Sequence, residues 1–441
     1  MLRIKLNHIK YGIERLVLFI LLFLYIYSIQ FFFIPFGIGS RVVLALFGIG
    51  VYFIKQYPHL VKGKFPINKK TYSIGIFLIM ISVVSILSLI FNNTQDLSFV
   101  KYPVSIILIM FGAYFIAYIF RNIYHEITFK LIADYVIAAV LFQVLLAVIL
   151  FLFPFLKSSL FSLLSLSDLD NMLINETGEF RLIGFGSYFF GAGITNSFVL
   201  ILIAILLKTM KFDFRIFFSY MACFLLILCI GIMMSRTTIV GGAISLLIAF
   251  YKSNLSRFKI GIKVRNITRS FIIFALIIIS IVWILPSNIK DNLQIALNFG
   301  FELVINYIEH GELESASTDR LKEMYDVYPQ SFKTYVIGDG HYTDPQNPAS
   351  YYKHIDIGYL RLIYYFGVVG MLTFFLFQLK VIHTINKLFE KKYASFFGGA
   401  ILILLILNLK GFTDIFFLIY LFYFAKPNPE KIALTKYTYN E

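Results

Sequence analysis

The sequence predicts an all-α polytopic membrane protein with about 12 transmembrane helices and one large outer loop between the ninth and tenth spans. Two observations lead to this fold class. The chain is 59% hydrophobic and only 14% charged, and apolar runs of membrane-spanning length recur from end to end. A bilayer core about 30 Å thick needs roughly 20 helical residues, and only helices or closed barrels satisfy their backbone within it. The 441 residues therefore form mostly membrane helices.

Apolar runs separated by polar connections predict twelve spans. They lie near residues 16–34, 38–54, 72–91, 103–120, 131–153, 189–207, 216–234, 238–251, 270–285, 357–379, 395–409 and 412–425. The first run follows a short basic segment, and no small-residue cleavage site comes after it. We therefore expect a retained first span rather than a cleaved signal peptide.

The basic residues predict that both termini are cytoplasmic. With a cytoplasmic N-terminus, the inner connections and the tail at 426–441 hold 27 of the 39 Lys and Arg residues. Such a bias is typical of cytoplasmic loops, which also contact anionic lipids. The net charge of +15 is thereby explained by topology, and no nucleic-acid partner is expected.

Two connections are longer than a tight turn, and both are predicted outside. One covers residues 154–188 within the bundle of spans 1–9 (1–285), and the other is the large loop 286–356 that precedes spans 10–12 (357–425). Long ordered loops on a rigid helical scaffold are frequent places for function.

The large outer loop has helix signals of its own. In its stretch "ESASTDRLKEMYDVYP" we expect Ser317 to cap a short helix with Asp319 in its first turn.

Cations gather at the outer ends of the spans. The stretch "CIGIMMSRTTIVGGAISLL" places one arginine inside a long apolar run, and four more cations take similar positions. The five are Arg41, Arg181, Arg236, Arg361 and Lys410. Each alone is also explained as an interfacial side chain that reaches toward water. The large outer loop carries eleven acidic and five basic residues, so an anion on this face would have to be held by the membrane-edge cations.

The anion expected at such a place is the pyrophosphate of a lipid carrier whose tail lies among the spans. The planar fork of arginine matches phosphate oxygens bidentately, and each charge-assisted hydrogen bond contributes roughly 1.5–3 kcal/mol. Arg236 would then be a phosphate clamp at the outer mouth of a helix hairpin.

A second group of reactive residues lies in "GDGHYTDPQNPASYYKHIDIGYLRLIYYFGVVG". His341, Asp344, His354 and Asp356 come shortly before Arg361, so a candidate general base lies near a candidate phosphate ligand. Asp356 has the better position because it lies where the tenth span begins and the helix dipole stabilises a carboxylate. The alternative is an ordinary solvated loop with an aspartate at a helix entry.

These motifs together resemble the O-antigen polymerase and ligase superfamily. The resemblance rests on "MMSRTT" at the outer end of a span, an arginine between spans five and six, and a long outer loop that ends in an Asp-Ile pair before "GVVG". The stretches "STDRLKEM", "IGDGHYTD" and "IDIGYLRLIYYFGVVG" resemble repeat-unit polymerases of the Wzy type in particular. The resemblance covers roughly residues 175–425.

The resemblance implies a helical bundle in the bacterial inner membrane with a large periplasmic loop. The implied enzyme is a glycosyltransferase that moves a growing glycan from undecaprenyl pyrophosphate to the non-reducing end of another lipid-linked repeat unit. No metal or other cofactor is implied. The lipid-linked oligosaccharide is the implied substrate, and a chain-length regulator and a flippase of the same pathway are candidate partners.

Matched to the family pattern, Arg181 and Arg236 would bind pyrophosphate. Asp356 stands where the ligases especially have a histidine, so the base is either Asp356 itself or one of His354 and His341 from the loop. The remaining candidates are second phosphate or sugar contacts (Arg320, Arg361 and Lys410) and aromatic rings for sugar faces (Tyr342, Tyr351 and Tyr352). For these three tyrosines, an interfacial aromatic belt is an equal alternative.

Two other functions stay open at this point. Within the superfamily, an O-antigen ligase would pass the finished glycan to the lipid A core, and the aspartate in place of histidine leans toward a polymerase. From another class, a lipid-linked oligosaccharide flippase would show charged residues along a central cavity and pseudo-symmetric halves. The sequence displays neither of these features.

Overall fold

The part of the chain that the structure describes folds into helices joined by non-helical connections. The computed structural model describes residues 2–62, 69–210, 213–250, 286–311, 315–347 and 350–425, with a few single positions between 265 and 273. No strand occurs in these ranges, and the only pairing of extended backbone there consists of isolated bridges. The α-helices are α1 (Leu2–Tyr27), α2 (Ser40–Leu60), α3 (Lys69–Asn92), α4 (Tyr102–Tyr124), α5 (Phe129–Leu152), α6 (Pro154–Phe161), α7 (Asp168–Thr177), α8 (Phe189–Thr209), α9 (Phe214–Met234), α10 (Thr238–Phe250), α12 (Ser287–His310), α13 (Ala316–Tyr325), α14 (Phe332–Val336), α15 (Gly358–Leu388), α16 (Ala394–Leu407) and α17 (Phe416–Tyr423).

Six of these helices are long and apolar enough to cross a membrane. They are α3, α4, α5, α8, α9 and α15, and each coincides with a span that the hydropathy pattern predicts. α10 and α16 are apolar but shorter. The predicted span 270–285 and the tail 426–441 lie outside the described residues. An all-helical chain with several membrane-spanning helices is therefore what the described part displays.

The last predicted span, 412–425, is helical over only eight residues, Phe416–Tyr423. Residues 408–415, which precede α17, are not helical, and polar side chains bind backbone N–H groups in and next to this segment. Thr413 donates its N–H to Asn408 Oδ1 at 3.2 Å, and Phe416 donates its N–H to Asp414 Oδ1 at 2.7 Å. The connection 408–415 is thus an ordered, non-helical segment between α16 and α17.

A short helix does form in "ESASTDRLKEMYDVYP", with Asp319 in its first turn. The expectation that Ser317 caps it was wrong, because the N-cap is Ser315. Ser315 and Thr318 form a capping box in which each side chain binds the backbone N–H of the other. Ser317 lies inside the helix α13.

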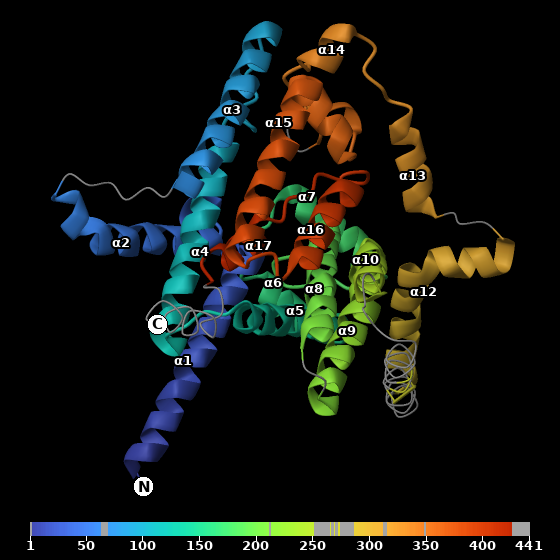
Figure 1. The fold of residues 1–441 in the computed structure, drawn as a ribbon. Coiled ribbons are helices and arrows are strands. Elements are labelled where there is room, and N and C mark those ends of the chain that lie inside the picture. The colour runs from blue at the N-terminus through green and yellow to red at the C-terminus, as the bar shows by residue number, and fades with distance from the viewer. Residues whose placement is uncertain are drawn as a thin grey trace.

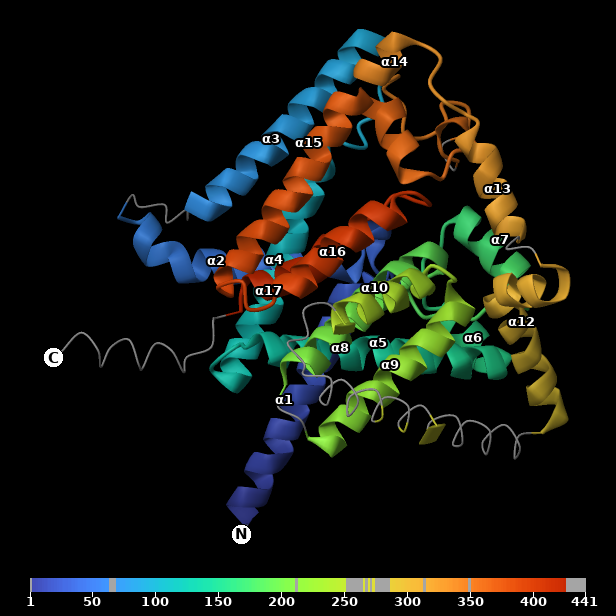
Figure 2. The ribbon, with the colours of Figure 1, turned by 45° about the vertical axis from the view of Figure 1, so that its right-hand side comes forward.

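The helices form two groups that lie beside each other (Figure 1). α3, α4 and α15 stand together, and Ser88 Oγ of α3 donates to the Tyr365 carbonyl of α15 at 2.7 Å. The second group contains α8, α9, α10 and α16, with α8 the most deeply buried of the six membrane-spanning candidates. Turning the molecule shows α12 and α13 along its outer edge, beside the second group (Figure 2).

The first glycine of "GVVG" has a backbone role. α15 is kinked at Phe366 and Gly367, and Gly367 has φ +70°. A Cβ there would lie 2.1 Å from the Val336 carbonyl oxygen of α14. Only glycine gives both the left-handed backbone and the close approach of α14. Through this contact α14, which lies in the loop 286–356, is anchored on α15.

Candidate functional site

Several helix ends meet on one face of the bundle. The connection 178–188 reaches the end of α9, where Leu182 donates its N–H to the Met233 carbonyl at 3.3 Å. The connection 408–415 reaches the start of α15, where Tyr359 donates its N–H to the Asn408 carbonyl at 3.2 Å. These ends are among those that the basic-residue pattern assigns to one side. The cations that they carry are brought together in this way.

Arg181 is held against the C-terminal end of α9. Its Nε donates to the Met234 carbonyl at 2.6 Å. Its guanidinium lies 4.6 Å from the centre of the Phe189 ring and 5.3 Å from that of Phe299. Because carbonyls at a helix end have no intrahelical partner, they favour a cation there. Burial, followed by the charge of Arg236, lowers the pKa of Arg181 to about 10.

Arg236 lies between α9 and α10 and contacts α12. Its Nε donates to the Phe299 carbonyl at 3.0 Å, its Nη2 forms an ion pair with Glu302, and its Cζ lies 4.5 Å from the centre of the Phe299 ring. The Arg236 side chain is 10% exposed and that of Glu302 is 29% exposed. The Phe299 ring therefore lies against both arginines, and the Glu302 carboxylate occupies a position where an anionic ligand of Arg236 would compete.

Lys410, in the connection 408–415, joins the two arginines electrostatically. Burial and then the charges of Arg181 and Arg236 lower its pKa to about 8, and Asp356 opposes this shift. Within the described part of the chain, its ammonium makes no hydrogen bond or ion pair. Lys410 is thus within electrostatic reach of both arginines and of the Asp356 carboxylate. We call Arg181, Arg236, Lys410 and Asp356 the outer charge cluster.

Asp356 is exposed and precedes α15 by two residues. Its N–H lies 3.4 Å from Met324 Sδ of α13, and Met324 packs with Ile355, Ile357 and their neighbours in a small apolar core. α13 therefore fixes the backbone of Asp356, and the Asp356 side chain stays accessible. That combination suits a group that must meet a substrate.

Arg361 lies between two tyrosines. Its Cζ is 3.4 Å from the centre of the Tyr351 ring and 4.1 Å from that of Tyr342. The residue is only 7% exposed, and its Nε has no hydrogen-bond partner in the described residues. A buried guanidinium with an unpaired donor is costly, so this arrangement suits a residue that completes its hydrogen bonds with a ligand.

The α3–α4 connection holds the loop that carries Tyr342. Asp96 Oδ2 accepts the backbone N–H groups of Tyr342 at 2.7 Å and Thr343 at 3.0 Å. Burial alone would raise the pKa of Asp96, but these hydrogen bonds and those from Ser98 lower it overall. The Asp96 carboxylate is therefore charged near neutral pH and fixes one of the two rings around Arg361.

The other candidates lie elsewhere on the outer loop. The His341 ring faces the Tyr352 ring with centroids 5.2 Å apart, and the Tyr352 hydroxyl donates to Asp339 at 3.3 Å. Burial and the Asp339 charge raise the pKa of Tyr352 to about 12. His354 and Arg320 are exposed. In the described part of the chain, no hydrogen bond, ion pair or ring contact joins His341, Tyr352, His354 or Arg320 to Arg181.

Two features of the face were not anticipated from the sequence. Arg41 donates Nε and Nη2 to the Tyr25 and Ile26 carbonyls at 2.7 and 2.5 Å, so it closes the end of α1. The sequence gives no sign of a role for Asp414, because it lies in an apolar run that predicts a span. Its Oδ2 accepts the Tyr102 hydroxyl at 2.8 Å.

Comparisons of the chain with protein-family models, curated proteins and solved structures find no match.

Proposed function

We propose that this chain is a metal-independent glycosyltransferase that polymerises lipid-linked oligosaccharide repeat units. In this proposal the growing glycan leaves undecaprenyl pyrophosphate and joins the non-reducing end of a second lipid-linked unit at the periplasmic face. The observation that carries the proposal is the outer charge cluster, where three cations and an accessible carboxylate meet at the ends of membrane-spanning helices.

The cations supply what a pyrophosphate leaving group requires. Arg181 and Arg236 lie against the same Phe299 ring, and mutual repulsion with Lys410 is relieved when a multiply charged anion binds between them. A surplus of buried positive charge also favours the transition state, because negative charge develops on the leaving oxygen as the glycosidic bond breaks. The large outer loop is acidic and repels an anion, so the anion would be held by this cluster and not by the loop.

The carboxylate supplies the base. In the proposed step, the acceptor hydroxyl oxygen attacks the anomeric carbon of the donor sugar, and its proton passes to Asp356. The bond between that carbon and the phosphate oxygen breaks, and its electron pair stays on the pyrophosphate, which the arginines hold. Arg361 and its two tyrosines would then orient a sugar or a phosphate near the start of α15.

The proposed topology places the site correctly for such a substrate. Both termini in the cytoplasm and the 286–356 loop in the periplasm would put the outer charge cluster at the periplasmic edge of the inner membrane. An undecaprenyl chain could then lie among the helices with its pyrophosphate at the cluster. Cysteine accessibility at exposed Asn347 and Arg215 tests this arrangement, since the two positions should react from opposite sides.

The function is tested by the banding pattern of the surface glycan in a deletion strain. Wild type should restore a ladder, whereas Arg236→Ala and Asp356→Ala should leave a single repeat unit on the core despite normal membrane expression. Arg215→Ala and Asp326→Ala are matched controls at exposed positions outside the cluster, and both should restore the ladder. A full ladder from both cluster variants would overturn the assignment.

The same strains separate the alternative functions. A ligase would leave polymer that is unattached to the core in the deletion strain. A flippase would leave lipid-linked repeat units on the cytoplasmic side. Single units on the core together with translocated lipid-linked units are the polymerase outcome.

A further inference from the structure

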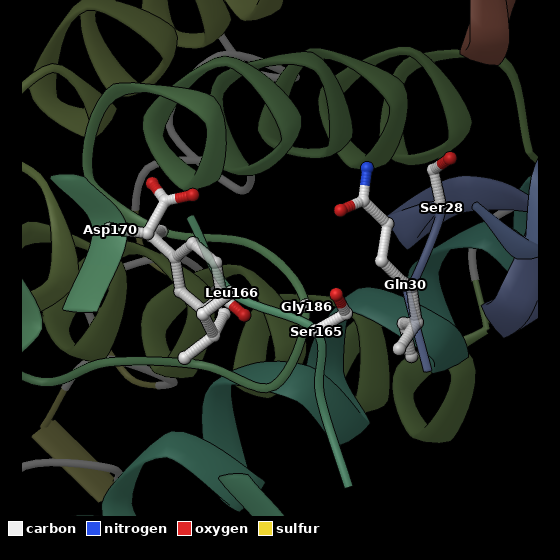
Figure 3. Close-up of a pocket in the computed structure, with 8 residues that line it drawn as sticks. Ser28, Gln30, Ser165, Leu166, Asp170 and Gly186 are labelled. Carbon is white, nitrogen blue, oxygen red and sulfur yellow. The ribbon is translucent and has the colours of Figure 1, made fainter. Parts of the chain in front are cut away.

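A cavity of about 190 Å³ is lined by residues outside the outer charge cluster. Polar side chains on its wall come from three connections: Ser28 and Gln30 after α1, Ser165 before α7, and Tyr188 before α8, with Asp170 from the first turn of α7. In Figure 3 the Asp170 carboxylate lies on one side and the Gln30 and Ser28 side chains on the other, with space between them.

The walls of the cavity are built by backbone contacts rather than by loose loops. Ser165 donates its N–H to the Gln30 carbonyl at 2.9 Å, and Phe32 donates its N–H to the Leu163 carbonyl at 3.0 Å. The third wall is fixed by Gly186, whose φ is +77° and where an added Cβ would lie 2.5 Å from Ile29 Cγ1. The cavity therefore exists before any ligand arrives.

Its polar groups remain open to a ligand. In the described part of the chain, the side chains of Ser28, Gln30 and Ser165 make no hydrogen bond, and Asp170 uses only Oδ2, which accepts the Ser167 hydroxyl at 2.6 Å. Ser28 also has φ +48°, a strained backbone for a serine. Strain of this kind concentrates at ligand sites. Gln30 and Ser165 are exposed, so the cavity opens at the surface.

The charges of the lining decide which ligand chemistry fits. It contains one carboxylate and no cation, so it repels phosphate, in contrast to the outer charge cluster. One carboxylate with neutral amide and hydroxyl groups offers both donors and acceptors to a hydroxylated ligand. Cavities of about 150 Å³ hold a benzene-sized molecule, so this volume admits one six-membered ring with substituents. The Tyr188 ring adds an apolar face on which such a ring can stack.

We propose that this cavity binds one neutral sugar ring. The carboxylate of Asp170 and the amide of Gln30 would hydrogen-bond its hydroxyl groups from opposite sides, and Tyr188 would cover one face. Its further assignment as the pocket for the acceptor end of the glycan rests on the proposed function.

The cavity is close enough to the cluster for that assignment. The Arg181 Cζ lies 4.6 Å from the Phe189 ring centre, and the Phe189 and Tyr188 ring centres lie 6.3 Å apart. The guanidinium and the Tyr188 ring centre are therefore separated by no more than these two distances combined. A few sugar residues can bridge such a gap, so one glycan can touch both places.

Binding is tested on the full chain in lipid nanodiscs by saturation-transfer NMR with glucose, galactose, N-acetylglucosamine and rhamnose. At least one sugar should bind wild type, and Gln30→Ala and Asp170→Asn should each weaken that binding about tenfold or more. Gln30 makes no side-chain hydrogen bond with described residues, so its replacement should leave the fold intact. Glu176→Gln, an exposed acid on the same helix outside the cavity, is the matched control and should bind as wild type.

Equal binding by wild type and both cavity variants, or no binding of any of the four sugars, would overturn the proposal. Displacement of the sugar by sodium pyrophosphate in the Arg236→Ala variant would also overturn it, because it would mean that the cavity takes anions. Sugar binding without glycan polymerisation would leave the cavity standing and reject the proposed function. Polymerisation unaffected by Gln30→Ala and Asp170→Asn would leave the proposed function standing and reject the assignment of the cavity to the acceptor end of the glycan.

Discussion

The most informative single perturbation is a change of pH around the pKa of Lys410. This pKa is lowered to about 8 by burial and by the two arginines of the outer charge cluster. A bound pyrophosphate would reverse the repulsion and raise the Lys410 pKa toward its usual value. The ligand therefore binds most tightly below about pH 8, where Lys410 already carries its proton, and more weakly above it.

The size of the effect follows from this pKa. With a pKa of about 8, the protonated fraction of Lys410 falls about tenfold between pH 7 and pH 9. Since one pKa unit corresponds to about 1.4 kcal/mol, the affinity for a pyrophosphate diester should also fall by about tenfold over this range. Arg181, with its pKa near 10, stays mostly charged throughout.

Isothermal titration of the nanodisc-embedded chain with a short-chain prenyl pyrophosphate sugar measures this directly. The diester carries a constant charge from pH 7 to pH 9, so the protein alone determines the slope. Lys410→Arg should flatten the profile because arginine stays protonated. A pH-independent affinity in wild type, or an unchanged slope in Lys410→Arg, would refute the assignment of Lys410 to the anion site.

Three further outcomes are expected. Glu302→Gln removes the carboxylate that competes with the donor pyrophosphate for Arg236. Because the Arg236–Glu302 ion pair is partly exposed, the donor KM, measured from initial rates, should fall by only about two- to fivefold. An unchanged or higher KM would contradict the competition. Gly367→Ala should destabilise the chain by about 1–3 kcal/mol from its positive φ alone, plus the clash with Val336, whereas Gly398→Ala, with open space around it inside α16, should melt no lower than wild type. Arg361→Lys loses the planar group that stacks on Tyr342 and Tyr351, so kcat/KM should fall about tenfold while the affinity for pyrophosphate stays constant. Equal losses in kcat/KM and in pyrophosphate affinity would place Arg361 at the phosphate.

Hydropathy and sidedness could predict the helical class and the meeting of the cations. Six apolar runs became helices of membrane-spanning length, and the predicted outer ends of spans carry Arg181, Arg236 and Lys410 to one region. This works because a bilayer imposes one length and one alternation of sides on every span. Sidedness does not predict what each cation binds. Arg41 also lies at a predicted outer end of a span, but its side chain donates to carbonyls at the end of α1.

The partners of these cations could not be predicted. Glu302 is 66 residues from Arg236, and the loop that carries Tyr342 to Arg361 is held by Asp96, from a connection before α4. Such contacts depend on tertiary packing and leave no periodic signal. The sugar-sized cavity is of the same kind, because its walls come from connections that are far apart in the chain and polar only by ordinary loop composition.

The central claim is that the outer charge cluster transfers glycan from a lipid pyrophosphate. It is tested most directly by reconstituting the purified chain with lipid-linked repeat units extracted from the deletion strain. Glycan length and released undecaprenyl pyrophosphate are then counted together. The account predicts oligomers with one pyrophosphate carrier released per unit joined, and loss of both signals in Arg236→Ala and Asp356→Ala. Intact repeat units with no carrier released by the wild-type chain, or full activity in both variants, would contradict it.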